Sequence, residues 1–266
     1  MEYSIFYSWQ SDAPDVCNRN FIRQALDDAV SEMATIATVE DSPRVESGME
    51  GIAGTPEVAT MMFTRIDRCA IFIGDMTLVG EIHNADSDQV KRVPNPNVLL
   101  EMGYAAGIIG WSRIICVMNE HFGERMELPF DVRNRRFPID YDLAPGDRAA
   151  ANKVRNDLAR WLKFAIETVG KTEYAATSEA INSLDIDCLE ILQRFGPSDY
   201  FVLPKFPATV FGQLDTSKYN AAVVRLLGLR LLKADVDANK GLYAYHWTYL
   251  GKQVLLELEI RSENPA

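Results

Sequence analysis

Glu101 is the residue whose surroundings most directly suggest chemistry, because it interrupts the mainly small and apolar segment 95–107 (Asn-Pro-Asn-Val-Leu-Leu-Glu-Met-Gly-Tyr-Ala-Ala-Gly). A charge among apolar neighbours costs free energy unless it is solvated, paired or used. A carboxylate held there could stabilise positive charge that develops on a reacting group. The alternative is a partly exposed glutamate stabilised by the dipole of its own helix.

The element that must position Glu101 is a helix over this segment. Asn95 is a favourable N-cap, and Pro96 fits the first helical position, where its missing N–H costs nothing. Apolar residues follow at helical spacing, namely Val98, Leu99, Met102 and Ala106. We expect four small residues to let the helix approach a sheet closely: Gly103, Ala105, Ala106 and Gly107.

Strands and helices alternate through the first 170 residues. The predicted strands are residues 3–9, 35–39, 69–74, 113–118 and 137–141, and the other predicted helices are 18–33, 56–68 and 148–169. Residues 42–55 and 78–94 are predicted as loops. Such alternation predicts an α/β domain with a doubly wound, parallel, five-stranded sheet covered by helices on both faces.

Ligands of such sheets bind beyond the carboxyl ends of the strands. This rule gathers the loop after Trp9, the loop after Asp41, Asp75 and the Glu101 helix along one edge. The glycines at 48, 51 and 54 lack the spacing of a phosphate-binding motif, so we interpret them as sources of loop flexibility. Arg44, in the same loop, is a candidate contact for a substrate phosphate.

The pattern changes after residue 170, and we predict domains at 1–170 and 171–266. Residues 174–195 and 219–232 are predicted as helices, 201–210 as a loop, 243–249 as a strand and 251–260 as a short helix or strand. This order resembles a winged-helix module. Its 10 basic and 12 acidic residues leave a charge of −2, whereas a DNA-reading module carries a basic face. An interaction or autoinhibitory role is therefore expected.

Composition narrows the class of protein. The net charge of −11 argues against general affinity for nucleic acid or anionic membranes. No secretory leader or membrane-spanning stretch is evident, and four scattered cysteines without a C-x-x-C pair indicate reduced thiols. The three histidines are too dispersed to suggest a metal site. We therefore expect a cytoplasmic protein without metal.

Three segments resemble bacterial Toll/interleukin receptor (TIR) domains. Phe6-Tyr7-Ser8-Trp9-Gln10-Ser11-Asp12 is similar to their first strand and loop, and Cys69-Ala70-Ile71-Phe72-Ile73-Gly74-Asp75-Met76-Thr77 to their third strand. The segment 95–105 resembles the helix that carries their catalytic glutamate. The same motif occurs in nucleoside deoxyribosyltransferase-like proteins, which share this flavodoxin-like layout. The resemblance covers residues 1 to about 165; the Trp-Cys pair of receptor-type TIR domains is missing.

The resemblance implies cleavage of the nicotinamide–ribose bond of NAD, which is the substrate and not a resident cofactor. Glu101 would be the catalytic carboxylate, since nicotinamide leaves as a neutral molecule and the ribose develops oxocarbenium character. Further candidate substrate contacts are Tyr7, Ser8, Trp9, Arg44, Asp75, Asn97 and Tyr104. Trp9 has the alternative of a core aromatic, and Asp75 that of a turn residue.

The resemblance also implies a role in bacterial antiphage defence, with activity switched on by self-association through the TIR domain and with the loop 42–55 as its mobile part. Two other functions stay open at this point. One is a nucleoside or nucleotide N-glycosidase or deoxyribosyltransferase. The other is a non-catalytic scaffold that assembles partners.

Overall fold

The computed structural model describes residues 4–34, 43–47, 58–83, 90–135, 138–198, 200–204, 216–237 and 242–263. The chain divides into two compact units, Met1–Val169 and Gly170–Ala266, and the 35-residue helix α5 (Arg148–Asn182) contributes to both. None of the helices in the described ranges combines the length and the apolar character needed to cross a bilayer.

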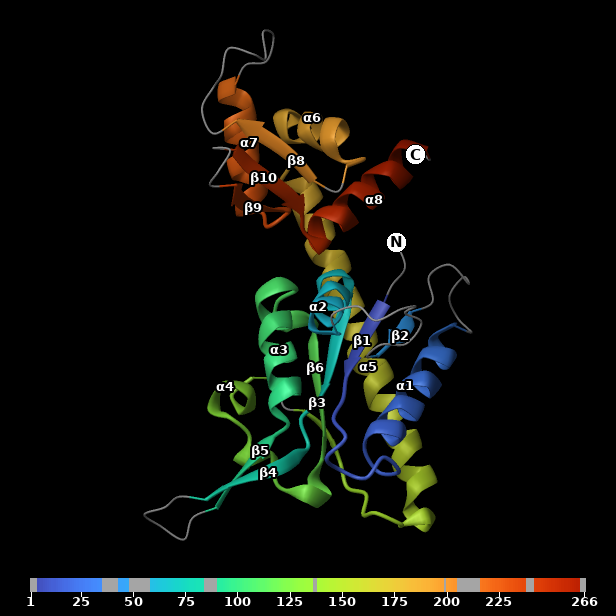
Figure 1. The fold of residues 1–266 in the computed structure, drawn as a ribbon. Helices are drawn as coiled ribbons and strands as arrows, with labels where there is room; N and C mark the ends of the chain where they lie inside the picture. The colour runs from blue at the N-terminus through green and yellow to red at the C-terminus, as the bar shows by residue number, and fades with distance from the viewer. Residues whose placement is uncertain are drawn as a thin grey trace. The chain divides into compact units, whose positions relative to one another are not determined.

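The first unit is built on a five-stranded parallel sheet of order β2-β1-β3-β6-β7 (Figure 1). Its strands are β1 (Ser4–Ser8), β2 (Arg44–Glu46), β3 (Ile71–Asp75), β6 (Ile114–Asn119) and β7 (Ile139–Tyr141). All four strand pairings are parallel. The sheet order is that of flavodoxin-like doubly wound folds, so the predicted α/β class is confirmed for this unit.

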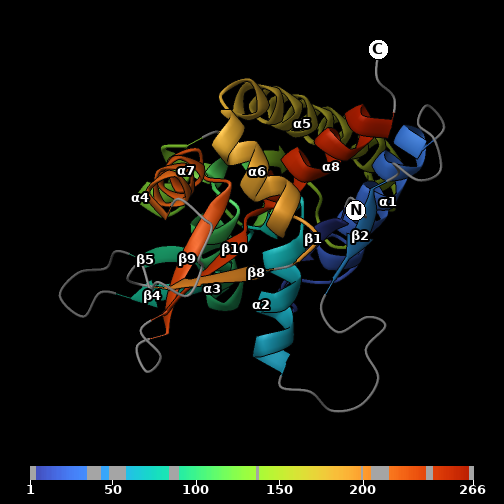
Figure 2. The ribbon, with the colours of Figure 1, turned by 90° about the horizontal axis from the view of Figure 1, so that it is seen from above.

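Helices cover both faces of this sheet, as the views in Figures 1 and 2 show. Helices α2 (Val58–Arg68) and α3 (Pro96–Ile108) pack together on one face, where Phe63 meets Tyr104 with ring centroids 4.4 Å apart. Helix α1 (Arg19–Ala34) and the first part of α5 lie on the other face, joined by the ion pairs Arg155–Asp28 and Lys163–Glu32. The central strand β3 is buried along its whole length, which explains its uninterrupted apolar run.

Two stretches predicted as loops contain strands. Residues 78–94 include the antiparallel pair β4 (Leu78–His83) and β5 (Val90–Pro94). This ribbon is largely exposed, so its charged side chains give no period-2 apolar pattern to recognise. Strand β2 lies inside the predicted loop 42–55; it is only three residues long and is held by backbone pairing with β1. The predicted strand 35–39 and the glycines at 48, 51 and 54 lie outside the described residues.

The remaining elements of the first unit are short. The 3₁₀ turn Trp111–Arg113 leads from α3 into β6. Two further 3₁₀ turns, Glu120–Phe122 and Arg125–Glu127, and the helix α4 (Phe130–Arg133) connect β6 to β7. The apolar core between the sheet and helices α2 and α3 includes Phe6, Phe72, Met76, Val98 and Met102.

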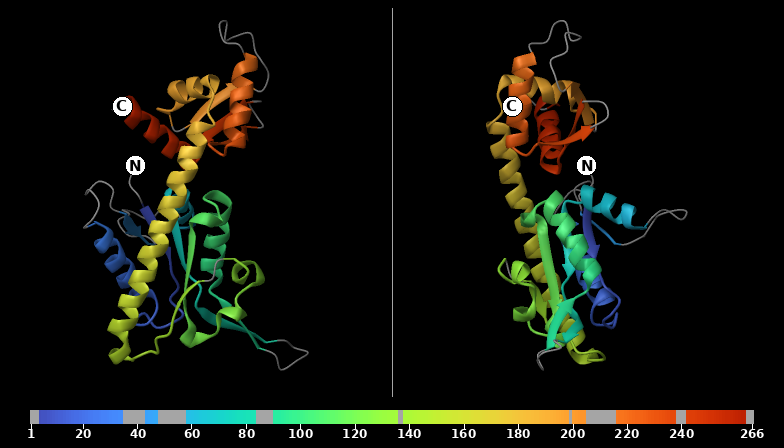
Figure 3. Two further views of the ribbon diagram at one scale, coloured as in Figure 1. Left: turned by 180° about the vertical axis from the view of Figure 1, so that it is seen from behind. Right: turned by 60° about the vertical axis from the view of Figure 1, so that its left-hand side comes forward.

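The second unit holds α6 (Ile186–Phe195), β8 (Tyr200–Pro204), α7 (Thr216–Gly228), β9 (Leu232–Asp237), β10 (Leu242–Trp247) and α8 (Tyr249–Glu263). Its strands form an antiparallel sheet of order β8-β10-β9. Figure 3 shows the ribbon from two further directions. The core of this unit includes Leu192, Leu226, Trp247 and Val254.

Several predicted boundaries in this unit are wrong. The single helix expected over 174–195 is interrupted, because the side chain of Asp185 accepts a hydrogen bond from the Cys188 N–H (2.8 Å) and starts α6 as a new helix. Strand β8 occupies part of the expected loop 201–210, and α7 stops at Gly228, so the residues to 232 do not continue it. Residues 251–260 belong to the helix α8.

Candidate active site

The strand order reverses between β1 and β3, which is where ligands bind in sheets of this kind. Ser8 ends β1 and pairs in register with Gly74, next to Asp75 at the end of β3. Helix α3 packs on these same strands (Figure 1). Its second turn carries Glu101. The fold therefore brings Ser8 and Glu101 together and places Asp75 directly after Gly74, the strand partner of Ser8.

Ser8 and Glu101 are hydrogen-bonded to each other. The Ser8 hydroxyl donates to Glu101 Oε2 at an Oγ–Oε2 distance of 2.6 Å, across 93 positions of sequence. Ser8 is buried, whereas Glu101 is half-buried and still reaches solvent. Burial raises the pKa of Glu101 above its ordinary value, and the Ser8 hydroxyl opposes this shift because it stabilises the ionised carboxylate. The pair forms an oriented anion at the switch point of the sheet.

Helix α3 starts as predicted. The Asn95 side chain accepts hydrogen bonds from the N–H groups of Asn97 (2.8 Å) and Val98 (3.3 Å), and Pro96 follows it. Asn97 is exposed and lies four positions before Glu101, on the same side of the helix. Asn97 therefore lies one helical turn from Glu101.

The small residues of α3 are used differently from our expectation. Ala105 is fully buried against the sheet side, but Gly103 and Gly107 are exposed, and a Cβ at either would meet nothing within 4 Å. The prediction that both glycines permit close packing is wrong, since a helix turns these positions away from the face that holds Ala105.

Tyr104 points toward helix α2. Its hydroxyl donates to Asp67 Oδ1 at 2.7 Å, and its ring packs on Phe63. Burial, together with the nearby Asp67 carboxylate, raises the pKa of Tyr104 to about 12. The hydroxyl is thus neutral at ordinary pH and committed to Asp67.

Trp9 lies beside a cation that sequence reasoning missed. The Arg19 guanidinium carbon stands 3.4 Å from the centroid of the Trp9 ring, and both side chains are half-buried. A guanidinium stacked flat on indole keeps its N–H edge available for an anion. The sequence predicts only a helix over residues 18–33 and does not single out Arg19. Arg19 stands at the first position of α1, and only the folded loop between β1 and α1 brings its side chain to Trp9.

Asp75 is fully buried, and its carboxylate takes part in a polar network. It accepts hydrogen bonds from Gln10 Nε2 (3.1 Å), Asn18 Nδ2 (3.5 Å) and the Thr77 N–H (3.0 Å). Burial raises the pKa of Asp75, and the bonds from Thr77, Gln10 and Asn18 oppose that shift. The carboxylate faces protein donors and not an open cleft.

Asn119, another residue that the sequence did not single out, extends this network. Its N–H donates to Thr77 Oγ1, and its side-chain amide donates to the carbonyls of Cys17 and Leu143. Tyr141 also donates to the Cys17 carbonyl, at 2.8 Å. Asn119 ends β6, so only its place at the end of an apolar strand could have marked it.

Two other candidate contacts lie away from Glu101. Tyr7 is 1% exposed, and its hydroxyl donates to the Arg19 carbonyl at 3.3 Å, so its side chain belongs to the core beneath α1. Arg44 pairs in register with Ser4 at the amino end of β1. Ser4 lies four residues before Ser8 along β1, which corresponds to roughly 13 Å. The structure therefore does not bring Arg44 to the Ser8–Glu101 pair.

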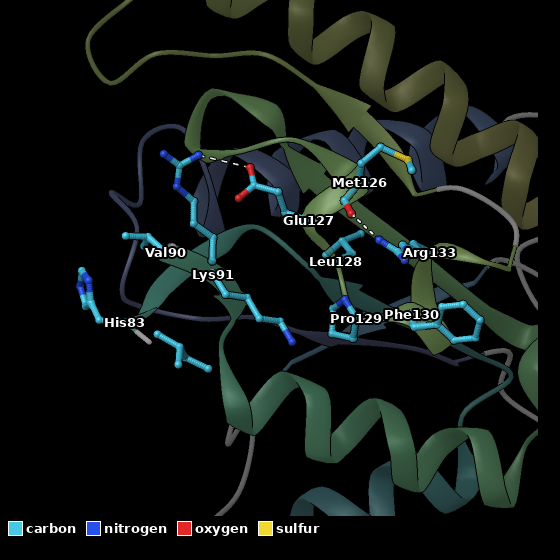
Figure 4. Close-up of a pocket in the computed structure, with 11 residues that line it drawn as sticks. His83, Val90, Lys91, Met126, Glu127, Leu128, Pro129, Phe130 and Arg133 are labelled. Carbon is cyan, nitrogen blue, oxygen red and sulfur yellow. Dashed lines mark hydrogen bonds and ion pairs between the residues drawn. The ribbon is translucent and has the colours of Figure 1, made fainter. Parts of the chain in front are cut away.

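A separate groove of about 890 Å³ lies beside the β4–β5 ribbon (Figure 4). The ribbon provides Ile82, His83, Val90, Lys91 and Arg92, and the segment leading into α4 provides Met126, Glu127, Leu128, Pro129, Phe130 and Arg133. Arg92 pairs with Glu127 at 3.3 Å across it. None of the site residues predicted from the sequence lines this groove.

Within the described parts of the chain, no group of three or more His, Cys, Asp or Glu side chains is placed to hold a metal ion. A comparison of the whole chain with models of known protein families finds no match, and neither does a comparison with curated protein sequences.

Proposed function

We propose that this protein is a TIR-type NAD glycohydrolase and that Glu101 is its catalytic carboxylate. The observation that carries the proposal is the 2.6 Å hydrogen bond from Ser8 to Glu101 at the switch point of a flavodoxin-like sheet. It joins two segments, 6–12 and 95–105, that each resemble TIR domains.

One oriented carboxylate suffices for the reaction. The bond between ribose C1′ and the nicotinamide nitrogen breaks, and its electron pair returns to the ring, which leaves as neutral nicotinamide. The ribose becomes oxocarbenium-like, and the Glu101 carboxylate stabilises this positive charge. A water molecule then forms the new bond to C1′ and loses a proton, which gives ADP-ribose; attack by an oxygen or nitrogen of the substrate itself would give a cyclic product.

The neighbours of Glu101 support a dinucleotide substrate. Trp9 offers a partly exposed ring for stacking on nicotinamide or adenine, and Arg19 beside it offers a cation for the diphosphate. Asn97 lies on the same side of α3 as Glu101, within reach of ribose hydroxyls. Ser8 is buried and directed at Glu101, so its role is to orient the carboxylate.

The second unit supports a role in control. The order α6, β8, α7, β9, β10, with β10 between the other two strands, is consistent with a winged-helix module. Its residues 171–266 carry 10 basic and 12 acidic side chains, which does not favour DNA binding. We propose that this unit receives an activating protein or ligand, that activity rises on self-association of the first unit, and that the setting is bacterial antiphage defence.

Chromatography of NAD incubated with the purified full-length chain at high concentration tests the proposed function. We expect nicotinamide to appear together with ADP-ribose or a cyclic form. A parallel incubation with deoxynucleosides and free bases tests the transferase alternative. Base exchange without NAD cleavage would replace the proposal with a deoxyribosyltransferase, and no reaction in either incubation, at any protein concentration, would favour a scaffold.

A further inference from the structure

We propose that Asp75 is a positioning residue for Glu101, acting through Gln10, Asp12 and the N-cap residue Asn95. The inference rests on the proposed function, and it concerns how the catalytic helix α3 is held in register with Ser8. Asp75 itself is fully buried and touches neither Glu101 nor Ser8 through any of its hydrogen bonds.

A continuous set of hydrogen bonds leads from Asp75 to the start of α3. Gln10 Nε2 donates to Asp75 Oδ2 (3.1 Å), and Gln10 Oε1 accepts from the N–H of Asp12 (2.5 Å) and of Ala13 (2.8 Å). Asp12 Oδ2 then accepts from Asn95 Nδ2 at 2.7 Å. The other side-chain atom of Asn95, Oδ1, caps the helix whose second turn carries Glu101.

Asp75 determines the direction of this chain because Gln10, Asn18 and Thr77 all donate to its carboxylate, which accepts each bond. It forces the amide of Gln10 to present its NH₂ group to Asp75, and the Gln10 oxygen must then face the loop N–H groups. An amide at position 75 could donate as well as accept, so Gln10 could turn over and release Asp12. Gln10 is only 2% exposed, so water cannot readily replace the lost bonds.

The burial of a carboxylate at position 75 is better explained by a positioning role than by a purely structural role in the core. A buried carboxylate is costly, and its stabilising partners named above are neutral donors and not a cation. Retaining such a group is reasonable where it fixes one arrangement of a site. The loop 9–18 and the N-cap of α3 meet at the hydrogen bond between Asp12 and Asn95. Ser8 comes just before this loop and Glu101 lies one to two turns after this cap, so the bond helps to set how the two side chains meet.

Tyr141→Phe is the matched control. Tyr141 is 7% exposed and donates one buried hydrogen bond, to the Cys17 carbonyl at the other side of the same network. Its bond does not lie on the path to Asn95. A merely stabilising role for the network predicts that Asp75→Asn and Tyr141→Phe behave alike in the full-length protein.

The test compares NAD cleavage by Asp75→Asn, Tyr141→Phe and the double change Asp75→Asn with Gln10→Glu. We expect Asp75→Asn to lower kcat at least tenfold with KM changed less than threefold, and Tyr141→Phe to leave kcat within twofold. The double change restores the Gln10–Asp75 hydrogen bond with donor and acceptor exchanged, so it should recover most of the lost kcat. Equal loss of kcat in both single variants, or no recovery in the double variant, overturns the proposal.

A second measurement does not depend on the reaction. Hydrogen exchange of the Asn97 and Val98 amides reports whether Asn95 still caps α3. We expect Asp75→Asn to speed this exchange at least tenfold and Tyr141→Phe to leave it unchanged. If wild-type protein cleaves no NAD, the proposed function fails, and the exchange result alone decides the positioning role. If Asp75→Asn does not fold, Asn95→Ser decides, since serine keeps the cap but loses the donor to Asp12; unchanged kcat in that variant overturns the proposal.

Discussion

Replacement of Glu101 by glutamine is the most direct test of the proposed chemistry. Glutamine has the shape of glutamate, keeps an oxygen that can accept the 2.6 Å bond from Ser8, and is an equally good helix former. Helix α3 should therefore keep its place. The single property that changes is the negative charge at the switch point of the sheet.

The expected loss follows from the position of that charge. A carboxylate about 4 Å from the developing positive charge contributes roughly 4 kcal/mol at an effective dielectric constant near 20, and less where water enters. Glu101 is half-buried, so a loss of about 3 to 4 kcal/mol in transition-state stabilisation is reasonable. This corresponds to a fall in kcat of roughly 100- to 1000-fold.

The assay is chromatographic measurement of nicotinamide release at saturating NAD, with circular dichroism and thermal melting of the same preparations. Glu127→Gln is the matched control, since Glu127 is another half-buried carboxylate of the first unit, paired with Arg92 in the separate groove. We expect it to retain kcat within about twofold. If Glu101→Gln retains activity within a few-fold of wild type and its circular dichroism is unchanged, Glu101 is not the catalytic carboxylate.

Three further predictions concern the same site. Ser8→Ala removes the donor that stabilises the ionised carboxylate, so the pKa of Glu101 should rise further. The acid limb of the kcat–pH profile should then move to higher pH; an unmoved limb would mean that Ser8 does not influence the pKa of the catalytic group. Trp9→Ala should raise KM about fivefold, from roughly 1 kcal/mol of lost stacking, with little change in melting temperature; a collapsed melting temperature with unchanged KM would make Trp9 a core residue. Specific activity should fall over a hundredfold dilution of the protein, and constant activity of a monomer seen by light scattering would exclude self-association as the switch.

Local sequence determined the parts of the fold that depend on neighbouring residues. The cap at Asn95, the proline after it and the apolar spacing define α3 almost to the residue, because capping and amphipathic packing act within a few positions. The buried run ending at Asp75 likewise identifies β3, and the alternation of elements identifies the parallel sheet. Glu101 was therefore a sequence-level candidate.

Contacts between distant segments were decided only by the tertiary structure. The Ser8–Glu101 bond, the Arg19–Trp9 stack and the chain from Asp75 to Asn95 join residues on different elements, and no local pattern encodes such distances. The exposed β4–β5 ribbon escaped recognition because its apolar and charged residues do not alternate; Ile82 and Val90 are themselves exposed. The burial of a side chain also depends on the packed molecule. Helices and loops cover Tyr7 and Asp75, whereas Glu101, another candidate predicted from the sequence, keeps its access to solvent.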